Sequence, residues 1–214
     1  MRVGADGVVR VSSPPFVPAS VVADFVKGHT DFIDRALRRE ASRPGRAGVL
    51  LPSSSFYIRG HVLRMSPMSA DGRVFARIGA GVVNVIYPPD VDPASDRVQQ
   101  VARKAIVAAM REEARLFLPR RVAQLAAANG LAYSRVAVRD MRSQWGSCSS
   151  EGRICLNIQL MRLPDRLIDM VILHELAHTV HMDHGKEFYS LLDGLLGGRH
   201  AELSKELKTY STSF

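Results

Sequence analysis

Residues 171–188, VILHELAHTVHMDHGKEF, decide how the rest of the chain is interpreted. They contain the H-E-x-x-H pattern of zinc hydrolases, with histidines at His174 and His178 and a glutamate at Glu175. On an α-helix, residues four apart share a face and lie about 6 Å apart, so two such imidazoles can bind one metal ion. Glu175 lies about 100° further round the helix, where its carboxylate can reach a water on the metal without binding the metal. This is the position of a general base.

A zinc ion that keeps one position open for water needs a third protein ligand. Two further histidines, His181 and His184, follow the pattern closely. If the helix continued, His181 would lie a further turn along it, past the metal. His184 can return to the metal only if the helix ends first, and Gly185 permits such an end because glycine tolerates left-handed backbone angles. We therefore predict one Zn²⁺ ion, bound by His174, His178 and His184.

The pattern also occurs by chance in ordinary helices, so its surroundings matter. The apolar residues 171–173 and 176–177 predict a buried helix, in which unpaired histidines and a glutamate would be costly without a metal or other partners. His181 is predicted to lie beside the metal site or at the surface. Thermolysin-like enzymes use a downstream glutamate as third ligand, for which Glu202 is the candidate, and this alternative to His184 stays open.

Three segments of the chain resemble the YgjP-like metallopeptidases, relatives of the SprT-like proteases. HELAHTVHMDHGKEFY at 174–189 is similar to that family's H-E-L-x-H-…-M-N-H-S-x-x-F-W, RSQWGSCS at 142–149 to its R-x-R-W-G-S-C-S, and GRICLN at 152–157 to its G-x-I-x-L-N. The resemblance implies a zincin-like catalytic unit with the same three histidines as ligands and Glu175 as catalytic residue. The departures from the family pattern are Gln144 for Arg, Asp183 for Asn, Gly185 for Ser and Tyr189 for Trp.

The remaining pattern predicts an α+β fold. A helix is expected over about 18–41, and β-branched and aromatic runs between glycine turns predict a small antiparallel meander over 48–87. A long helical region should follow to about residue 129, kinked or split by Pro119. We therefore divide the chain into an N-terminal β-rich region with one helix, residues 1–92, and a zincin-like catalytic domain, residues 93–214.

Charge suggests possible partners. The 214 residues include 29 Lys and Arg against 21 Asp and Glu, a formal net charge of +8, and nine of those cations but only three of the acids lie in residues 101–150. A basic face attracts nucleic acid, nucleotides or acidic peptides. The competing interpretation is a solvated helix face in an arginine-rich proteome, because no exposed aromatics alternate with the charges as in a single-strand binder.

Several classes of protein are excluded by composition. No apolar run approaches 18 residues, so we expect no transmembrane helix, and the first residues lack the apolar core of a secretory signal. The two cysteines, Cys148 and Cys155, form neither a C-x-x-C pair nor a disulfide framework. Reduced cysteines are consistent with a cytoplasmic location. The sequence does not determine the oligomeric state.

The predicted function is a zinc metallopeptidase that cleaves peptide bonds, with a peptide or protein as substrate. Glu175 would take a proton from water and pass it to the leaving amine. His181, Arg142 and Tyr189 are candidate donors for the oxyanion, but no substrate-binding residue is predicted. The alternatives are a metal-dependent nucleotide pyrophosphatase or phosphohydrolase, and a nucleic-acid-associated module with a structural zinc. Glu175 argues against a structural zinc, because such a site needs no base.

Overall fold

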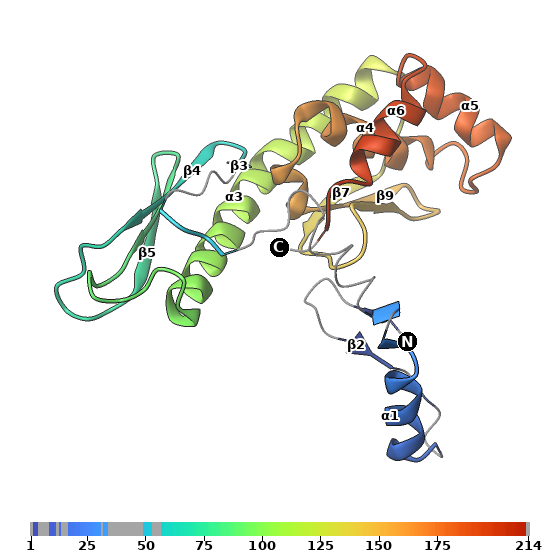
Figure 1. The fold of residues 1–214 in the computed structure, drawn as a ribbon. Coiled ribbons are helices and arrows are strands. Elements are labelled where there is room, and N and C mark those ends of the chain that lie inside the picture. The colour runs from blue at the N-terminus through green and yellow to red at the C-terminus, as the bar shows by residue number, and fades with distance from the viewer. Residues whose placement is uncertain are drawn as a thin grey trace.

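The structure is a computed structural model that describes residues 2–3, 9–11, 13, 17–30, 32–33, 49–52 and 57–212. The elements are, in chain order, β1 (Arg2–Val3), β2 (Val9–Arg10), α1 (Ala19–Lys27), β3 (Tyr57–Ile58), β4 (His61–Ser66), β5 (Phe75–Gly79), β6 (Val82–Ile86), α3 (Asp96–Ala128), β7 (Arg135–Arg139), β8 (Gly146–Cys148), β9 (Arg153–Asn157), the 3-10 helix η1 (Ile158–Arg162), α4 (Asp165–Ala177), α5 (Lys186–Leu195) and α6 (His200–Leu207) (Figure 1). The fold is α+β, as predicted.

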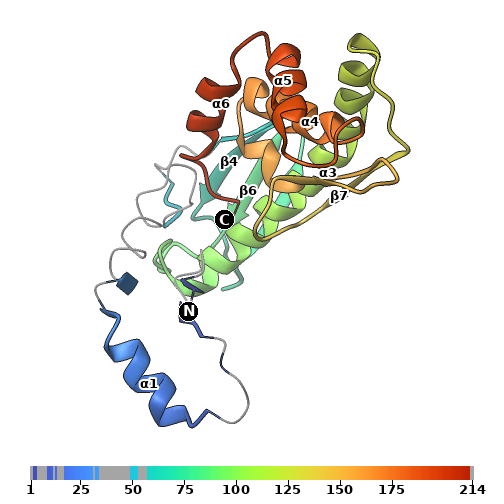
Figure 2. The same ribbon diagram turned by 90° about the vertical axis from the view of Figure 1, so that its right-hand side faces the viewer.

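The long helix α3 packs against both of the larger sheets and, together with α4, supplies most of the described core. Its buried residues recur every three or four positions, and many are alanines, which favour helix and let neighbouring elements approach closely. One part of this face packs on β5 and β6, and another on β7, η1 and α4 (Figures 1 and 2). Pro119 was expected to kink or split the region, but it lies inside one helix of 33 residues. Leu118 and Val122, fully buried on either side of it, hold the helix in place.

The N-terminal sheet has the order β3-β4-β6-β5 and differs from the predicted antiparallel meander. β5 and β6 form an antiparallel hairpin, but β6 returns between β5 and β4 and pairs with β4 in parallel. The segment between β4 and β5 is long enough to carry β5 to the outer edge. β6 has the most buried residues of the sheet, Val83 and Val85 at 0% exposure, and so takes a central position against α3.

The predicted helix over 18–41 is interrupted, because residues 28–29 form a turn between α1 and the helical residues 30, 32 and 33. α1 ends at Lys27 with Gly28 as its C-cap, and positions 34–41 lie outside the described residues. Phe25 and Phe32, two apolar residues of the predicted helix, are 45% and 47% exposed. α1 has no buried residue because it lies apart from the other helices (Figures 1 and 2).

The second sheet, of order β7-β9-β8, lies beside α4. β9 is its central strand, parallel to β7 and antiparallel to β8, and Ile154 and Leu156 of β9 are buried in the core. β8 is therefore an edge strand, and it is packed against α4. The predicted boundary between residues 92 and 93 stays a prediction. No described helix is long and apolar enough to cross a membrane.

Candidate metal centre

The helix α4 supplies the first two predicted ligands and ends sooner than the sequence suggested. It begins after Pro164, runs to Ala177, and has His178 as its C-cap, followed by a turn. We expected Gly185 to end this helix through a left-handed backbone. Instead Gly185 has an ordinary φ of −79° and is the N-cap of α5. The early end of α4 leaves six residues in which the chain can turn back, and this brings His184 over His174.

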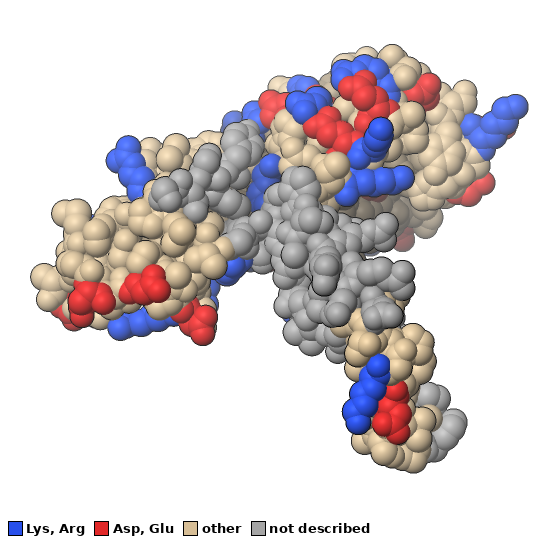
Figure 3. All heavy atoms as spheres, in the orientation of Figure 1, with Lys and Arg blue, Asp and Glu red and all other residues tan. Residues whose placement is uncertain are grey.

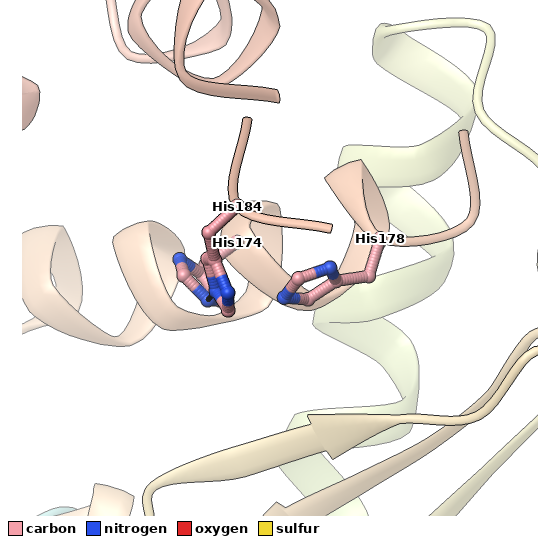
Figure 4. A group of neighbouring side chains, drawn as sticks. All are labelled: His174, His178 and His184. Atoms are coloured by element: carbon pink, nitrogen blue, oxygen red, sulfur yellow. Dashed lines mark hydrogen bonds between the residues drawn. The ribbon is translucent and has the colours of Figure 1, made fainter. Parts of the chain in front are cut away.

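His174, His178 and His184 lie together, with one ring nitrogen of each within 4.8 Å of the others. Their rings converge from the end of α4 and from the segment before α5 (Figure 4). The Nε2 atoms of His174 and His184 are 3.2 Å apart. Two nitrogens bound to one zinc at 2.0–2.1 Å with a tetrahedral angle would be about 3.3 Å apart, so this spacing fits a shared metal ion.

The surroundings of His178 favour the tautomer that a metal ligand needs. Its Nδ1 lies 3.1 Å from the backbone carbonyl oxygen of His181, to which an Nδ1–H would donate. That assignment leaves Nε2 unprotonated and free to bind a metal. The side chain of His181 points elsewhere, with Nδ1 3.7 Å from a carboxylate oxygen of Glu187. His181 thus contacts the site through its backbone.

Phe188 forms the floor under the three imidazoles. It is fully buried, and its ring centroid lies 5.0, 4.4 and 4.8 Å from those of His174, His178 and His184. Burial, followed by the neighbouring histidines, lowers the pKa of His174 to about 4. Burial also lowers the pKa of His178. Both rings are therefore neutral near pH 7, as ligands must be.

Glu175 lies beside the histidines and is only 5% exposed. No hydrogen-bond donor of the described residues reaches its carboxylate. Burial alone raises its pKa to about 8. Gly146, at the start of the edge strand β8, packs directly on it. A Cβ at position 146 would lie 2.7 Å from Oε1 and 2.8 Å from Cγ of Glu175, closer than real contacts allow. Only glycine fits there without displacing the carboxylate.

Asn157 explains why two separate sequence motifs serve one site. Its side chain is fully buried, and its amide nitrogen donates to the backbone oxygens of Met141 (2.7 Å) and Gln144 (2.8 Å). Its backbone N–H donates to the carbonyl oxygen of Trp145 at 2.9 Å. These bonds fix the loop that leads into Gly146. The GRICLN segment therefore holds the RSQWGSCS segment against Glu175.

A cavity of about 440 Å³ opens beside the histidines. Its walls come from the loop before β8 and from α4, α5 and α6, and its lining includes His174, Glu175, His184 and Tyr189. Arg142 and His181, the other predicted oxyanion donors, do not line it. The carboxylate of Glu202, the alternative ligand, also lies elsewhere and is bound by Arg199 through two contacts of 3.0 and 3.1 Å.

The two cysteines offer no competing nucleophile. Both are free and partly exposed. Burial raises the pKa of Cys148 and of Cys155, so both stay as thiols near neutral pH.

The three histidines thus form a group that could hold a metal ion, with a buried carboxylate beside them. The sequence profile of the YgjP-like metallopeptidase domain matches residues 1–210. The chain belongs to this family, as the resemblance predicted, and is a metal-dependent peptidase by class. No curated protein matches it significantly.

Two solved structures are similar to part of the chain. The zymogen of the metallopeptidase abylysin from Pyrococcus abyssi is 20% identical, with a TM-score of 0.38, over 42% of this chain and 90% of that one. The zymogen of jannalysin from Methanocaldococcus jannaschii is 20% identical, with a TM-score of 0.37, over 41% of this chain and 90% of that one. Similarity at this level does not identify a substrate.

Proposed function

We propose that the chain is a zinc-dependent peptidase in which His174, His178 and His184 hold one zinc ion and Glu175 is the general base. The observation that carries the proposal is the convergence of three ring nitrogens within 4.8 Å, beside a buried carboxylate in one cavity. Three imidazoles suit zinc, and a catalytic zinc keeps its fourth position open. Within the described residues, the group that could hold a metal consists of these three histidines.

Each residue then has a defined task. Zinc bound here would polarise the scissile carbonyl and lower the pKa of water. Glu175 accepts a proton from the attacking water and returns it to the leaving amine. Burial raises the pKa of Glu175 in the metal-free protein, and a bound divalent ion would lower that pKa and favour the ionised carboxylate that a base needs. Gly146 leaves room for this carboxylate, and Phe188 orients the histidines.

Tyr189 is the favoured oxyanion donor among the three candidates from the sequence. It lines the cavity, with its ring centroid 6.1 Å from that of His184, whereas Arg142 and His181 lie outside the lining. A phenol O–H there can donate to charge that develops on the substrate. The edge strand β8 beside Glu175 offers unpaired backbone groups to an extended peptide. Both features favour a peptide over a nucleotide.

The alternatives receive less support. A structural zinc in a nucleic-acid-associated module would be closed by a fourth ligand, and the described residues place none beside the three histidines. A nucleotide phosphohydrolase needs a cationic pocket, yet Lys208 is the only Lys or Arg in the lining of the cavity. A cytoplasmic location stays a prediction.

Two substitutions test the proposal together. Glu175→Gln should keep one zinc per chain, measured by metal analysis, and lower peptide hydrolysis about 10²–10⁴-fold, because the amide is a poor base. His184→Ala should lose the zinc, while His181→Ala keeps it. Near-native turnover by Glu175→Gln would show that another group activates water. Equal zinc loss from the two histidine variants would reject His184 as the third ligand.

A further inference from the structure

One wall of the cavity belongs to α6 and its C-cap residue and carries three polar side chains at a spacing of four residues. His200, Ser204 and Lys208 all line the cavity. Residues four apart lie on one helical face, so these three form a stripe about 12 Å long. α6 packs against α4, which carries His174 and Glu175, so the stripe faces the proposed reaction centre (Figures 1 and 2).

The donors of this stripe have no acidic partner among the described residues. The acids of α6 are engaged elsewhere: Glu202 binds Arg199, and Glu206 binds Arg166 of α4. Lys208 keeps an exposed ammonium group, and no ion pair of the described residues includes it. Glu175 is the only acid in the lining. The cavity thus offers a positive charge and hydrogen-bond donors to a ligand that brings negative charge.

Apart from this stripe, Tyr189 and the residues of the candidate metal site, the lining is apolar. Met170 and Val171 of α4 contribute small accessible areas, at 5% and 4% exposure, and the larger surfaces of Trp145 and Leu207 complete the wall. Burial of an apolar group there gains about 25 cal/mol per Å² of area removed from water. A bare phosphate or nucleotide sugar would not use this surface, whereas an apolar side chain would.

We propose that this cavity is a substrate subsite for peptides that place a carboxylate at Lys208, beside an apolar residue packed on Trp145 and Leu207. The inference rests on the proposed peptidase function and adds the substrate class. The carboxylate comes either from an acidic side chain or from the free C-terminus of the peptide. Both would accept from the ammonium of Lys208 and from the hydroxyl of Ser204.

Trp145 allows binding to be measured without turnover, because it is the single tryptophan of the chain and lines the cavity. The zinc-loaded full chain with Glu175→Gln is titrated with apolar peptides that differ only by Glu against Gln, or by a free against an amidated C-terminus. We expect the acid form of at least one pair to bind about two- to fivefold more tightly, the range of an exposed ion pair. The preference should shrink as salt rises.

Lys205 provides the matched control, since it is an exposed lysine of the same helix that does not line the cavity. Lys208→Ala should abolish the acid preference, Lys208→Glu should invert it, and Lys205→Ala should leave it unchanged. If the Gln peptide binds more weakly than the Glu peptide, the subsite takes an acidic side chain. If the amidated peptide binds more weakly than the peptide with a free C-terminus, the subsite takes the chain end.

Three results would overturn the proposal: tighter binding of the acid peptide that survives Lys208→Ala, equal binding of acid and neutral peptides, or no fluorescence change with any peptide. Tighter Lys208-dependent binding of AMP or inorganic phosphate than of every peptide would assign the cavity to nucleotides instead.

Peptide hydrolysis by the native chain distinguishes a failure of this subsite from a failure of the proposed peptidase function. Cleavage without charge preference rejects the subsite alone, and charge-selective binding without any cleavage rejects the peptidase alone.

Discussion

The N-terminal sheet region and the histidine site each bury a side chain of nearly the same size and shape, in opposite ways. Gln99, 8% exposed near the start of α3, donates to the carbonyl oxygens of Leu50 (2.7 Å) and Pro93 (2.8 Å) and accepts from the Leu50 N–H (2.9 Å). Glu175, 5% exposed in α4, receives no donor from the described residues, and its pKa is raised to about 8.

The contrast separates structural polar groups from chemical ones. A buried group whose hydrogen bonds are satisfied stabilises the fold, whereas an unsatisfied buried carboxylate costs stability and marks a site of function. Variants of the sheet region should therefore change stability alone. Variants around Glu175 should change metal binding, turnover or the dependence on pH.

The largest effect is expected at the floor of the site. Phe188→Ala should lower the free energy of unfolding by about 3–5 kcal/mol, because it leaves a large cavity. It should also weaken metal binding tenfold or more, since the three rings lose the surface that orients them. Denaturant unfolding and metal titration measure the two quantities, and Phe188→Leu is the milder variant if alanine prevents folding.

Val83→Ala is the matched change in the sheet region, because Val83 is also 0% exposed. It should lower stability by about 2 kcal/mol and leave the metal dissociation constant unchanged. If Val83→Ala weakened metal binding as much as Phe188→Leu, the two regions would not be separable in this way.

The next effect concerns Gly146 and should appear in turnover. Gly146→Ala pushes on Glu175 and should lower kcat about 10²-fold, equivalent to about 2.7 kcal/mol, while the metal content stays near one per chain. Gly79 of β5 is the control, since an added Cβ there meets nothing within 4 Å. Steady-state kinetics of both variants decide the matter. Equal losses at the two glycines would show a general effect of alanine in strands.

The role of Gly146 also has a test that needs no activity. Alanine at 146 should lower the unfolding midpoint of the native chain but not of a Glu175→Ala chain, in which the clashing Cγ and carboxylate are gone. A cost of the same size in both backgrounds would mean that Gly146 makes room for some other group.

A smaller effect should follow from the pKa of Glu175 in the metal-free protein. The group ionises near pH 4.5 when unfolded and near pH 8 when folded. Between these values the folded state binds more protons, so stability is present at low pH and falls as pH rises through this window. The full shift would be worth about 5 kcal/mol, but the carboxylate lines an open cavity, so we expect on the order of 2 kcal/mol.

Unfolding of the metal-free chain at pH 5 and pH 8, with a chelator present, measures this effect. Glu175→Gln should gain stability relative to the native chain at pH 8 and little at pH 5. Gln99→Ala should lose the same stability at both values, because no titrating group takes part in its hydrogen bonds. A native chain whose stability relative to Glu175→Gln does not change with pH would contradict the raised pKa.

Spacing along one helix was sufficient to predict His174, Glu175 and His178 as neighbours, because their geometry is local. His184 was also predicted at the site, but through a helix stop at Gly185 that the structure does not have. The chain turns back earlier instead, just after Ala177. A helix end anywhere in the six residues before His184 would let the chain turn back to the site. The sequence therefore identified His184 but not the path of the backbone that leads to it.

Contacts between distant segments could not be predicted in this way. Gly146 is 29 positions from Glu175, and nothing near either residue indicates that they touch. Asn157 and Gly146 lie in the segments that resemble the family, but only the structure shows what they do: Asn157 fixes the loop before β8, and Gly146 leaves room for Glu175. The parallel pairing of β4 with β6 was missed because alternating burial is the same in parallel and antiparallel strands.

The smallest effect is expected from the basic residues of α3, where the sequence left nucleic-acid binding open. Arg121 is held by Asp169 of α4 through two contacts of 2.6 Å, Arg115 lies 3.4 Å from Glu112, and Arg111 lies 4.0 Å from Asp140. Cations and acids also alternate over the part of the surface formed by α4, α5 and α6 (Figure 3). These pairs reduce the charge available to phosphates.

We therefore expect weak binding of DNA or RNA, with a slope of log K against log salt no steeper than about −2, since each phosphate contacted adds about −0.9. Arg111→Glu combined with Arg115→Glu should change that slope by less than about 1, because both arginines already have acidic neighbours. Fluorescence anisotropy with a labelled oligonucleotide from 20 to 200 mM salt, that is, over about one decade, measures it. A slope of about −5 that the double variant abolishes would contradict this expectation. It would favour a peptidase that acts on proteins bound to nucleic acid, with α3 as the contact surface.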